Sequence, residues 1–278
     1  MSEQTNTERV VLITGASSGI GKAVAAHLAA SGYLVFGTSR QAAFPTEIHT
    51  GAVNMIPMDI MTDQSISEGV AFIQQHTERI DVLINNAGYG LAGAIEETSI
   101  EEASMQMDTN FLGAVRLTNA ILPAMRARKD GIIIYMGSVV GRIAMPFQAF
   151  YSASKFALEG YSEALKIEVA PFHIKVYILE PGDFKTGFTG SRVVSMAARQ
   201  SLVYQPAMGN AISVMEHDEQ NGADPAQIGA TIAKLIKTRP GRFRLPVGPL
   251  YGKAALVLQR ILPHAWMEFA VRKYYKVG

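Results

Sequence analysis

Residues 9–21 read Arg-Val-Val-Leu-Ile-Thr-Gly-Ala-Ser-Ser-Gly-Ile-Gly, and this stretch decides the fold. Its first six residues form an apolar run that predicts a buried strand, and residues 15–21 form a glycine-rich turn that opens a predicted helix over residues 22–31. Glycine lets the backbone turn tightly and approach a pyrophosphate closely, and the start of the helix offers free N–H groups to the anion. A plain turn is the alternative, but the apolar strand before it and the helix after it favour nucleotide binding. The residues expected to hold the pyrophosphate are Gly15, Ser17, Ser18, Gly19, Ile20 and Gly21.

Beyond this stretch, apolar segments alternate with helix-like segments along the chain. Further strands are predicted over residues 34–38, 54–59, 82–85, 131–136 and 174–180, and further helices over residues 63–76, 100–128, 150–170 and 226–238. We expect the helix over residues 100–128 to kink near Pro123, and residues 240–249 to be irregular. The strands are apolar throughout, which is typical of a parallel sheet covered by helices on both faces. The sequence therefore predicts an α/β fold with a doubly wound parallel sheet, in a single domain over residues 1–278.

The composition excludes several classes of protein. Apolar residues make up 48% of the chain and charged residues 18%, so a sizeable core is expected and disorder is not. The absence of cysteine excludes disulfides, thiolate zinc sites and cysteine nucleophiles, and the six scattered histidines lack ligand spacing, so we expect no metal. The start of the chain is polar without a signal-peptide pattern, and no apolar run reaches the ~18–20 residues of a spanning helix. We therefore expect a cytoplasmic protein without stable membrane insertion and without a nucleic-acid partner.

The end of the second predicted strand bears on the choice of cofactor. In doubly wound sheets an acid at this place binds the ribose 2′-OH of NAD, whereas an arginine accommodates the 2′-phosphate of NADP. Here the strand ends in Thr38-Ser39-Arg40 with no acid, so Ser39 and Arg40 favour NADP(H) over NAD(H), with a surface arginine as the alternative. Asp59, followed by Ile60, ends the third strand, where it could bind the adenine amino group or act as an ordinary turn aspartate.

Two further segments supply polar groups at strand ends. The turn after the fourth strand is small and rich in amides, and can lie against the cofactor ribose; it contains Asn86, Ala87 and Gly88. Ser138 follows the strand over residues 131–136, at the edge where ligands bind in open sheets, and its hydroxyl is placed to donate to a substrate carbonyl. Asn110 lies in the middle of a predicted helix, where asparagine is unfavourable, and such a conflict can mark a functional site or a kink.

Tyr151 and Lys155 stand four residues apart in Tyr-Ser-Ala-Ser-Lys. On a helix these positions share a face, so the phenol and the ammonium point into one site. A nearby positive charge lowers the pKa of a tyrosine from about 10, which would suit proton transfer with a substrate oxygen near neutral pH. By itself such a pair is more often part of a solvated face, and its meaning depends on the other motifs.

Taken together, these residues resemble the short-chain dehydrogenase/reductase family over residues 9–188. The resemblance implies a Rossmann fold and hydride transfer between a nicotinamide and a carbonyl or alcohol carbon. Tyr151 would be the acid/base, and Lys155 would hold the nicotinamide ribose, lower the tyrosine pKa and lead a proton relay. Ser138 would orient the substrate oxygen and Asn110 would anchor the relay water. The remaining motif positions, expected at the nicotinamide end, are Pro181, Gly182 and Thr186.

The chain departs from many NADP-using members of that family at one position. These members carry a basic residue just before the second glycine of the turn, where this chain has Ser18. The expected NADP(H) preference therefore depends on Arg40 and on the missing acid, and NAD(H) stays open as a cofactor.

The segment after Thr186 points to the kind of substrate. Residues 151–172 resemble the branch of the family that contains estradiol-type hydroxysteroid dehydrogenases and retinol dehydrogenases. In this family the segment that follows, here residues 187–224, is the substrate lid, and in this chain it is rich in methionine and apolar residues. Such residues suit an adaptable apolar pocket, although they could instead pack the lid onto the body. We expect an apolar steroid-, retinoid- or lipid-like ketone or secondary alcohol as the small-molecule substrate.

The C-terminal residues 250–278 form a predicted helical extension that is apolar and basic. From Arg239 onward the chain carries eight Lys/Arg and a single acid, Glu268. This pattern is consistent with a peripheral contact to an anionic membrane, but packing over the substrate pocket or on a partner subunit is favoured. The family resemblance also implies a homodimer or homotetramer.

Two other functions remain open. An acyl-thioester ketoreductase would use the same chemistry on a carrier-bound substrate. A non-catalytic NADP(H)-sensing regulator would bind the cofactor without turnover, but such proteins typically lack the tyrosine or the lysine, and this chain has both. The leading expectation is an NADP-dependent oxidoreductase.

Overall fold

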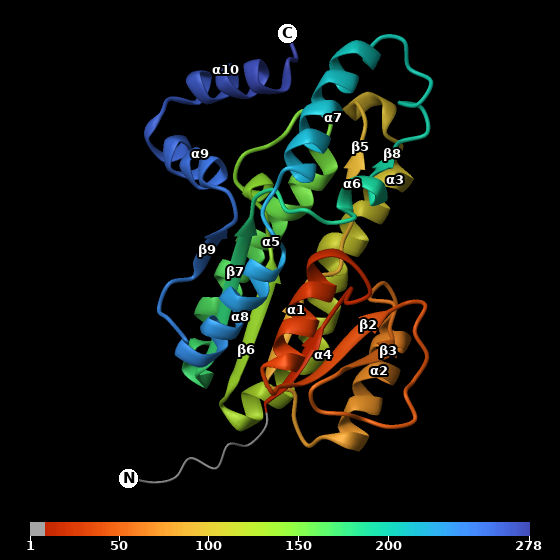
Figure 1. Cartoon of the computed structure of the whole chain (residues 1–278), viewed down its shortest axis with the longest axis vertical. Helices are drawn as coiled ribbons and strands as arrows, with labels where there is room; N and C mark the ends of the chain where they lie inside the picture. Colours follow the sequence, from red (N-terminus) through yellow and green to blue (C-terminus); the bar gives the residue numbers. More distant parts are fainter. Residues whose placement is uncertain (1–8) are drawn as a thin grey trace.

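The computed structural model describes residues 9–278, so the polar start of the chain and the first eight residues of the expected domain lie outside the described part. Seven parallel strands form one sheet in the order β3-β2-β1-β4-β6-β7-β9 (Figure 1). The strands are β1 (Val10–Ile13), β2 (Leu34–Ser39), β3 (Val53–Pro57), β4 (Val82–Asn85), β6 (Gly131–Met136), β7 (Ile174–Pro181) and β9 (Arg244–Val247). The order reverses between β1 and β4, and ligands bind beyond the carboxyl ends of the strands at such a reversal.

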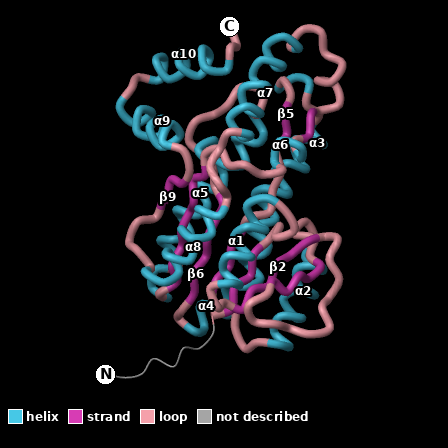
Figure 2. The backbone as a smooth tube through the Cα atoms, viewed as in Figure 1, coloured by secondary structure: helices cyan, strands magenta, loops and turns pink. Residues whose placement is uncertain are grey.

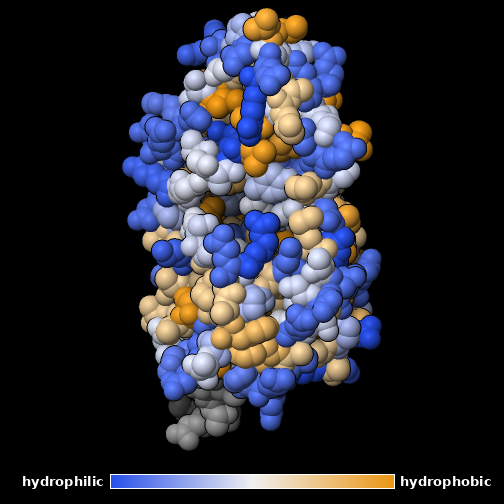
Figure 3. Space-filling model, turned by 90° about the vertical axis from the view of Figure 1, so that its right-hand side faces the viewer, coloured by the Kyte–Doolittle hydropathy of each residue, from blue (hydrophilic) through white to orange (hydrophobic). Residues whose placement is uncertain are grey.

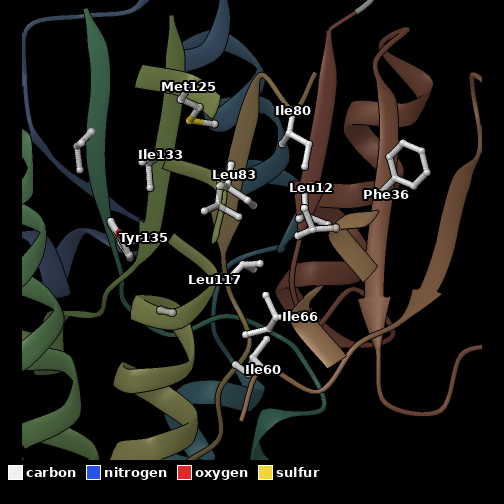
Figure 4. Close-up of a cluster of buried hydrophobic side chains, with 14 of the residues drawn as sticks. Leu12, Phe36, Ile60, Ile66, Ile80, Leu83, Leu117, Met125, Ile133 and Tyr135 are labelled. Carbon is white, nitrogen blue, oxygen red and sulfur yellow. The ribbon is translucent and has the colours of Figure 1, made fainter. Parts of the chain in front are cut away.

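Helices cover both faces of the sheet (Figure 2). They are α1 (Gly19–Ala30), α2 (Asp63–His76), α3 (Ile100–Met107), α4 (Gly113–Arg128), α5 (Ala149–Glu168) and α8 (Ala226–Thr238). Successive residues of a strand point to opposite faces, so Val11 packs with α1 and α8, whereas Leu12 packs with α2 and α4. Figure 4 shows the hydrophobic core on the face covered by α2 and α4, which contains Leu12, Leu83 and Leu117. Both faces of each central strand are therefore buried, which explains the unbroken apolar runs in the sequence, and the predicted doubly wound α/β fold is confirmed.

The helix predicted over residues 100–128 is interrupted at Asn110, one of the two places that the sequence raised. The helix is divided by a π-helical turn, Asp108–Leu112, in which the N–H of Gly113 donates to the carbonyl of Asp108. Pro123 lies inside α4 without ending it. The helix continues through Pro123 to Arg128, and the break in its α-helical hydrogen bonding falls at Asn110, the residue whose helix propensity conflicts with its place.

Residues 240–249 were expected to be irregular, and this expectation is wrong. They contain the edge strand β9. Its residues pair with β7 in parallel, with Ile178 opposite Arg244 and Pro181 opposite Val247. Arg244 also bonds Glu159 and Glu163 of α5, at 2.9 and 2.8 Å. The chain thus leaves the sheet after β7, forms the lid, and returns to complete the sheet.

The lid and the C-terminal extension lie beyond the carboxyl ends of the strands (Figure 1). The residues expected to form the lid, 187–224, contain α6 (Phe188–Ser191), β8 (Val193–Val194) and α7 (Gln205–Gln220), and β8 pairs with β5 (Leu91–Ala92). Figure 3 shows the side of the molecule that carries α2 and α3, where hydrophobic residues lie among hydrophilic ones in the upper part. The predicted C-terminal extension is confirmed as α9 (Leu250–Ile261) and α10 (His264–Tyr275). Within residues 9–278, no helix combines the length and the apolar character needed to span a bilayer.

The remaining elements are three short 3₁₀ helices. They are η1 (Ile95–Glu97), η3 (Val139–Gly141) and η4 (Ala170–Phe172). The second follows Ser138 directly, so it fixes the turn that carries this serine past the end of β6.

Candidate active site

The glycine-rich turn between β1 and α1 is shaped for close approach of a ligand. Gly15 and Gly19 have φ angles of +66° and +54°, which L side chains rarely adopt. A Cβ atom at Gly21 would lie 2.2 Å from the carbonyl oxygen of Gly15, so only glycine fits there. Ser18 precedes α1 and makes no capping hydrogen bond, so no side chain of residues 9–278 accepts from the N–H groups of the first turn. A pyrophosphate fits this cradle because these N–H groups and the helix dipole both favour an anion.

The turn after β4 supports the glycine-rich turn. The Asn86 side chain donates to the carbonyl oxygen of Thr14 at 2.8 Å, and the Thr14 hydroxyl accepts from the N–H groups of Asn86 and Ala87, both at 2.9 Å. Gly88 lies against Asn110, whose Oδ1 would be 3.0 Å from a Gly88 Cβ. The Asn86 amide thus holds the cradle together, and the segment expected to touch the cofactor ribose lies beside it.

The positions that bear on cofactor choice lie at the ends of β2 and β3. Arg40 is exposed, and no ion pair or hydrogen bond of its guanidinium is found within residues 9–278. The Ser39 hydroxyl accepts from the N–H of Gln41 at 3.3 Å. The Asp59 Oδ1 accepts from the N–H of Met61 at 3.0 Å, as in the turn alternative, while Ile60 is buried against Gly113. An unpaired arginine beside the cradle fits a 2′-phosphate.

Tyr151 and Lys155 lie on one face of α5, as their spacing predicts. Both are buried, and the Lys155 ammonium lies 5.7 Å from the centre of the Tyr151 ring. The same ammonium donates to the carbonyl oxygen of Met136, at the end of β6, at 2.8 Å. The lysine therefore joins the helix to the carboxyl edge of the sheet and points to the same region as the tyrosine.

The expectation that Lys155 lowers the pKa of Tyr151 is wrong for this structure. Burial raises the pKa of Tyr151 to about 12, and the interaction with the Ser138 hydroxyl opposes this rise only in part. Burial also lowers the pKa of Lys155 to about 8, because its ammonium is removed from water. The desolvation of the phenol outweighs the hydrogen bond with Ser138 and the positive charge of Arg192, so Tyr151 holds its proton at neutral pH.

Ser138 and the end of β7 lie beside the tyrosine. The Ser138 hydroxyl accepts from the N–H of Val140 at 3.2 Å and donates to the carbonyl oxygen of Pro181 at 3.4 Å. Gly182 donates through its N–H to Val247 of β9 at 3.0 Å. Thr186 lies near the cradle, because its Cβ is 3.7 Å from the position that a Cβ would take at Gly19. The two expected halves of the site, cofactor turn and substrate side, are thus in contact.

Asn110 holds the backbone of the turn after β4. Its Oδ1 accepts from the N–H of Tyr89 at 3.0 Å, and its Nδ2 donates to the carbonyl oxygen of Tyr89 at 2.9 Å. A weaker bond of 3.3 Å reaches the hydroxyl of Ser154, on the same helix as Tyr151. The side chain that was expected to anchor a relay water is therefore used to position the turn, and the π turn brings it there.

Sequence reasoning missed Gln148, which directly precedes α5 and stands three residues before Tyr151. Its side chain is 3% exposed, and its Nε2 has no hydrogen-bond partner within residues 9–278. This nitrogen lies 3.8 Å from the position that a Cβ would take at Gly90, and the Phe188 ring of the lid lies near the same position. The centre of the Phe188 ring is 5.9 Å from the centre of the Tyr151 ring. Gln148 stands three residues before Tyr151, and residues at this spacing are neighbours on a helix, so the sequence did contain a signal for it.

The lid also contributes a buried charge pair that no spacing could predict. Arg192 and Glu219 form an ion pair, and Glu219 accepts from the Thr189 hydroxyl at 2.5 Å. Asp183, which follows the Pro-Gly turn, accepts from the Tyr251 hydroxyl of α9 at 2.8 Å. Because these partners are far apart in the sequence, only the fold brings them to the substrate side.

A doubly wound sheet with a nucleotide cradle and a tyrosine–lysine face at its carboxyl edge defines a dinucleotide-dependent class of oxidoreductase. The sequence model of short chain dehydrogenases matches residues 9–196, and the chain belongs to that family. Comparison with curated proteins gives 44% identity to the 3-ketodihydrosphingosine reductase of Bacteroides thetaiotaomicron, over 97% of this chain and 98% of that protein.

Two further relatives place the chain within the family. It is 39% identical to retinol dehydrogenase 8 of Homo sapiens, over 68% of this chain and 64% of that protein. Among solved structures, a short-chain dehydrogenase from Streptomyces avermitilis superimposes with a TM-score of 0.81 at 33% identity, covering 100% of this chain and 98% of that one. The expected family and the resemblance to retinol dehydrogenases are confirmed.

Proposed function

We propose that this chain is an NADP(H)-dependent carbonyl reductase that acts on an apolar, lipid-like ketone, and in reverse on the secondary alcohol. The observation that carries the proposal is the buried face of α5, where Tyr151 and Lys155 lie beside Ser138 at the carboxyl edge of the sheet. The cradle of residues 15–21 and the exposed Arg40, for which residues 9–278 provide no ion-pair partner, support NADP(H) as the cofactor.

The roles of the side chains follow from their chemistry. Bound nicotinamide would supply the hydride that reduces the carbonyl carbon. Tyr151 and Ser138 would donate hydrogen bonds to the substrate oxygen, where negative charge builds as the reaction proceeds. Because burial keeps Tyr151 protonated, its phenol can deliver the proton to that oxygen, which favours the reductive direction. Lys155 would bind the ribose hydroxyls while Met136 holds its ammonium in place.

The proposed substrate class draws on the lid and on the relative with the highest sequence identity of those described above. The relative from Bacteroides thetaiotaomicron is named for the reduction of 3-ketodihydrosphingosine, and the similarity extends over nearly the whole of both chains. The lid places the Phe188 ring beside Tyr151, with the two ring centres 5.9 Å apart, while Met215 packs the lid against Tyr275 of α10. We therefore propose a long-chain ketone of this kind as the first substrate to test.

The test is a cofactor-consumption assay with purified protein, with NADPH or NADH, on 3-ketodihydrosphingosine, a long-chain ketone without the amino group, and a small polar ketone. We expect turnover on the long-chain ketones, preferably with NADPH, and a loss of about 10²–10⁴-fold in kcat for Tyr151→Phe with cofactor binding retained. Good turnover on the small polar ketone alone would contradict the proposed substrate class.

The assay also separates the two alternative functions. A β-ketoacyl thioester as the preferred substrate would identify an acyl-thioester ketoreductase. Tight NADPH binding without turnover on any ketone or alcohol would identify a cofactor-sensing regulator. Either result would replace the proposal.

A further inference from the structure

Helix α9 is apolar on two opposite sides. One side packs inward: Gly252 and Leu256 are buried, and Gly252 lies next to Val139, which follows Ser138. Leu250, Val257 and Ile261 are spaced by seven and four residues, so they share the opposite side, and all three are exposed, Ile261 by 69%. A surface helix normally presents a polar outer face, so packing within residues 9–278 does not explain this second apolar side.

Helix α10 repeats the arrangement after the bend at Pro263. Its inner side chains, Val271 and Tyr275, pack near Met145 of the body and Val214 of α7. On its outer side Trp266 and Phe269 are exposed by 67% and 64%. The two helices lie together at one corner of the molecule, beyond the carboxyl end of the sheet (Figure 1).

Basic side chains accompany the outer apolar residues of both helices. Residues 250–278 contain five Lys/Arg against Glu268, which lies 3.7 Å from Arg272. A surface hollow of about 570 Å³ on α10 is lined by both kinds of side chain, including Phe269, Arg272 and Lys273. We define the tail face as the exposed apolar and basic residues Leu250, Lys253, Val257, Leu258, Arg260, Ile261, Trp266, Phe269 and Lys273.

We propose that the tail face binds the surface of a bilayer that contains anionic lipids, with the apolar side chains entering the headgroup region and the basic ones binding phosphate groups. The net positive charge of the tail face favours an anionic bilayer over a second copy of the chain as its binding partner. A two-fold dimer contact places the same patch against itself, so a net positive face would meet like charge. An anionic bilayer instead complements the charge and removes the apolar side chains from water.

The position of the tail face links the bilayer to the active site. The inner side of α9 contacts Val139, and its Tyr251 hydroxyl donates to Asp183 at 2.8 Å, so α9 forms a wall of the substrate side. A bilayer on the outer side of the same helix would lie next to that wall. A lipid-like substrate could then enter without crossing water, although surface binding itself does not depend on which substrate is used.

The chain contains its own probe, because Trp266 on the tail face is its single tryptophan. The experiment adds vesicles of phosphatidylglycerol and phosphatidylcholine, or of phosphatidylcholine alone, to the full-length protein, and measures Trp266 emission together with co-sedimentation. We expect a blue shift and co-sedimentation with the anionic vesicles, quenching by lipids brominated near the headgroup, and loss of binding as salt is raised.

Matched variants test the two halves of the surface. Lys253→Gln/Arg260→Gln/Lys273→Gln should weaken vesicle binding on the order of 100-fold, since each basic residue near an anionic surface contributes about fivefold. The control Lys175→Gln/Lys234→Gln/Lys237→Gln removes three exposed lysines elsewhere and should bind as the parent does. Ile261→Ser/Phe269→Ser should also lose binding, whereas Ile95→Ser/Ile100→Ser, equally exposed apolar residues near α3, should not. A thermal melt of each variant checks its folding.

Three results would overturn the proposal. The first is an unchanged Trp266 emission with both kinds of vesicle, and the second is equal binding of the parent and the triple Gln variant. The third is a blue shift that follows protein concentration without lipid and is removed by Ile261→Ser/Phe269→Ser, because the tail face would then hold a second copy. None of these readouts uses turnover, so they stand apart from the assay of the proposed function.

Discussion

Lys155 lowers the stability of the fold that positions it. Its side chain is buried, and burial lowers its pKa from 10.5 to about 8, a shift that corresponds to ~3 kcal/mol against keeping the charged form inside. The hydrogen bond to Met136 offsets only part of this. A charge retained in such a place is consistent with a role in binding or catalysis.

The variant Lys155→Met should therefore be more stable than the parent at pH 7, by about 1–3 kcal/mol, and should be inactive. Between pH 8 and 10.5 the unfolded chain keeps the lysine proton and the folded chain does not, so parent stability rises with pH in this window. The advantage of the variant should accordingly shrink at about pH 9.5. Urea unfolding at both pH values measures it, with the exposed Lys234→Met as the control; an advantage that does not change with pH would contradict the buried-charge account.

Arg40 is the residue on which the NADP(H) preference depends. The substitution Arg40→Asp should lower the ratio of kcat/KM for NADPH to that for NADH by about 10–100-fold, because a charge-assisted contact to phosphate is lost and an acid is offered to the ribose hydroxyls. Initial rates with both cofactors measure the ratio. The exposed Arg242→Asp, at a distance from the cradle, should leave it unchanged. An equal ratio in both variants would show that Arg40 does not choose the cofactor.

At the scale of elements, the π turn Asp108–Leu112 is the feature that places a helix side chain in the site. It turns Asn110 toward Tyr89, where the side chain makes two hydrogen bonds to one backbone unit. The turn after β4 lies between the cradle and α5. A change in this element should therefore be felt in both stability and catalysis.

Asn110→Leu removes both bonds to Tyr89. It leaves the Tyr89 N–H without its partner, at a cost of about 1–3 kcal/mol, while the Tyr89 carbonyl oxygen keeps the hydrogen bond from Gln106 at 3.0 Å. We expect a lower unfolding midpoint and a lower kcat. Urea unfolding and initial rates measure the two effects. Asn119→Leu, an exposed asparagine on α4, should change neither, and an active Asn110→Leu would remove the positioning role.

Most of the fold follows from the sequence because the strands are buried on both faces and read as apolar runs. The sequence could not reveal β9, a four-residue strand that contains Pro246 and is half-buried. Proline is tolerated there because β9 lies at the edge of the sheet. The sequence offered both Pro123 and Asn110 as places where the helix over residues 100–128 could be interrupted, and only the hydrogen bonds of the structure show the break at Asn110.

The candidate site also has some features that the sequence predicts and others that only the folded structure shows. The spacing of Tyr151 and Lys155 indicated a shared face, because local geometry sets that face. The raised pKa of Tyr151 and the unpaired amide of Gln148 depend on burial, which comes from contacts distant in the sequence. The sequence names the groups, and the packing sets their protonation and their partners.

At the scale of the whole molecule, the sheet and the C-terminal helices make separable contributions. A chain that stops after Pro249 keeps β9, so we expect it to fold, with a lower melting temperature because the contacts of α9 and α10 are lost. A chain that stops after Arg239 lacks β9, exposes the edge of β7 and loses the bonds of Arg244 to α5, and should aggregate. Size-exclusion chromatography and thermal melts of the two chains decide this; a well-behaved shorter chain would show that β9 is dispensable.

The late place of β9 in the chain has a consequence for protein synthesis. On the ribosome, β7 emerges with the lid and α8 still to come, and its open edge waits for residues 244–247. At ~5–20 residues per second, this interval lasts roughly 3–13 s. During that time the nascent chain carries an unpaired strand edge that can join another copy on the same messenger. Translation that stalls within the lid would prolong this exposure, which makes speed through residues 182–243 a condition for a good yield of native protein.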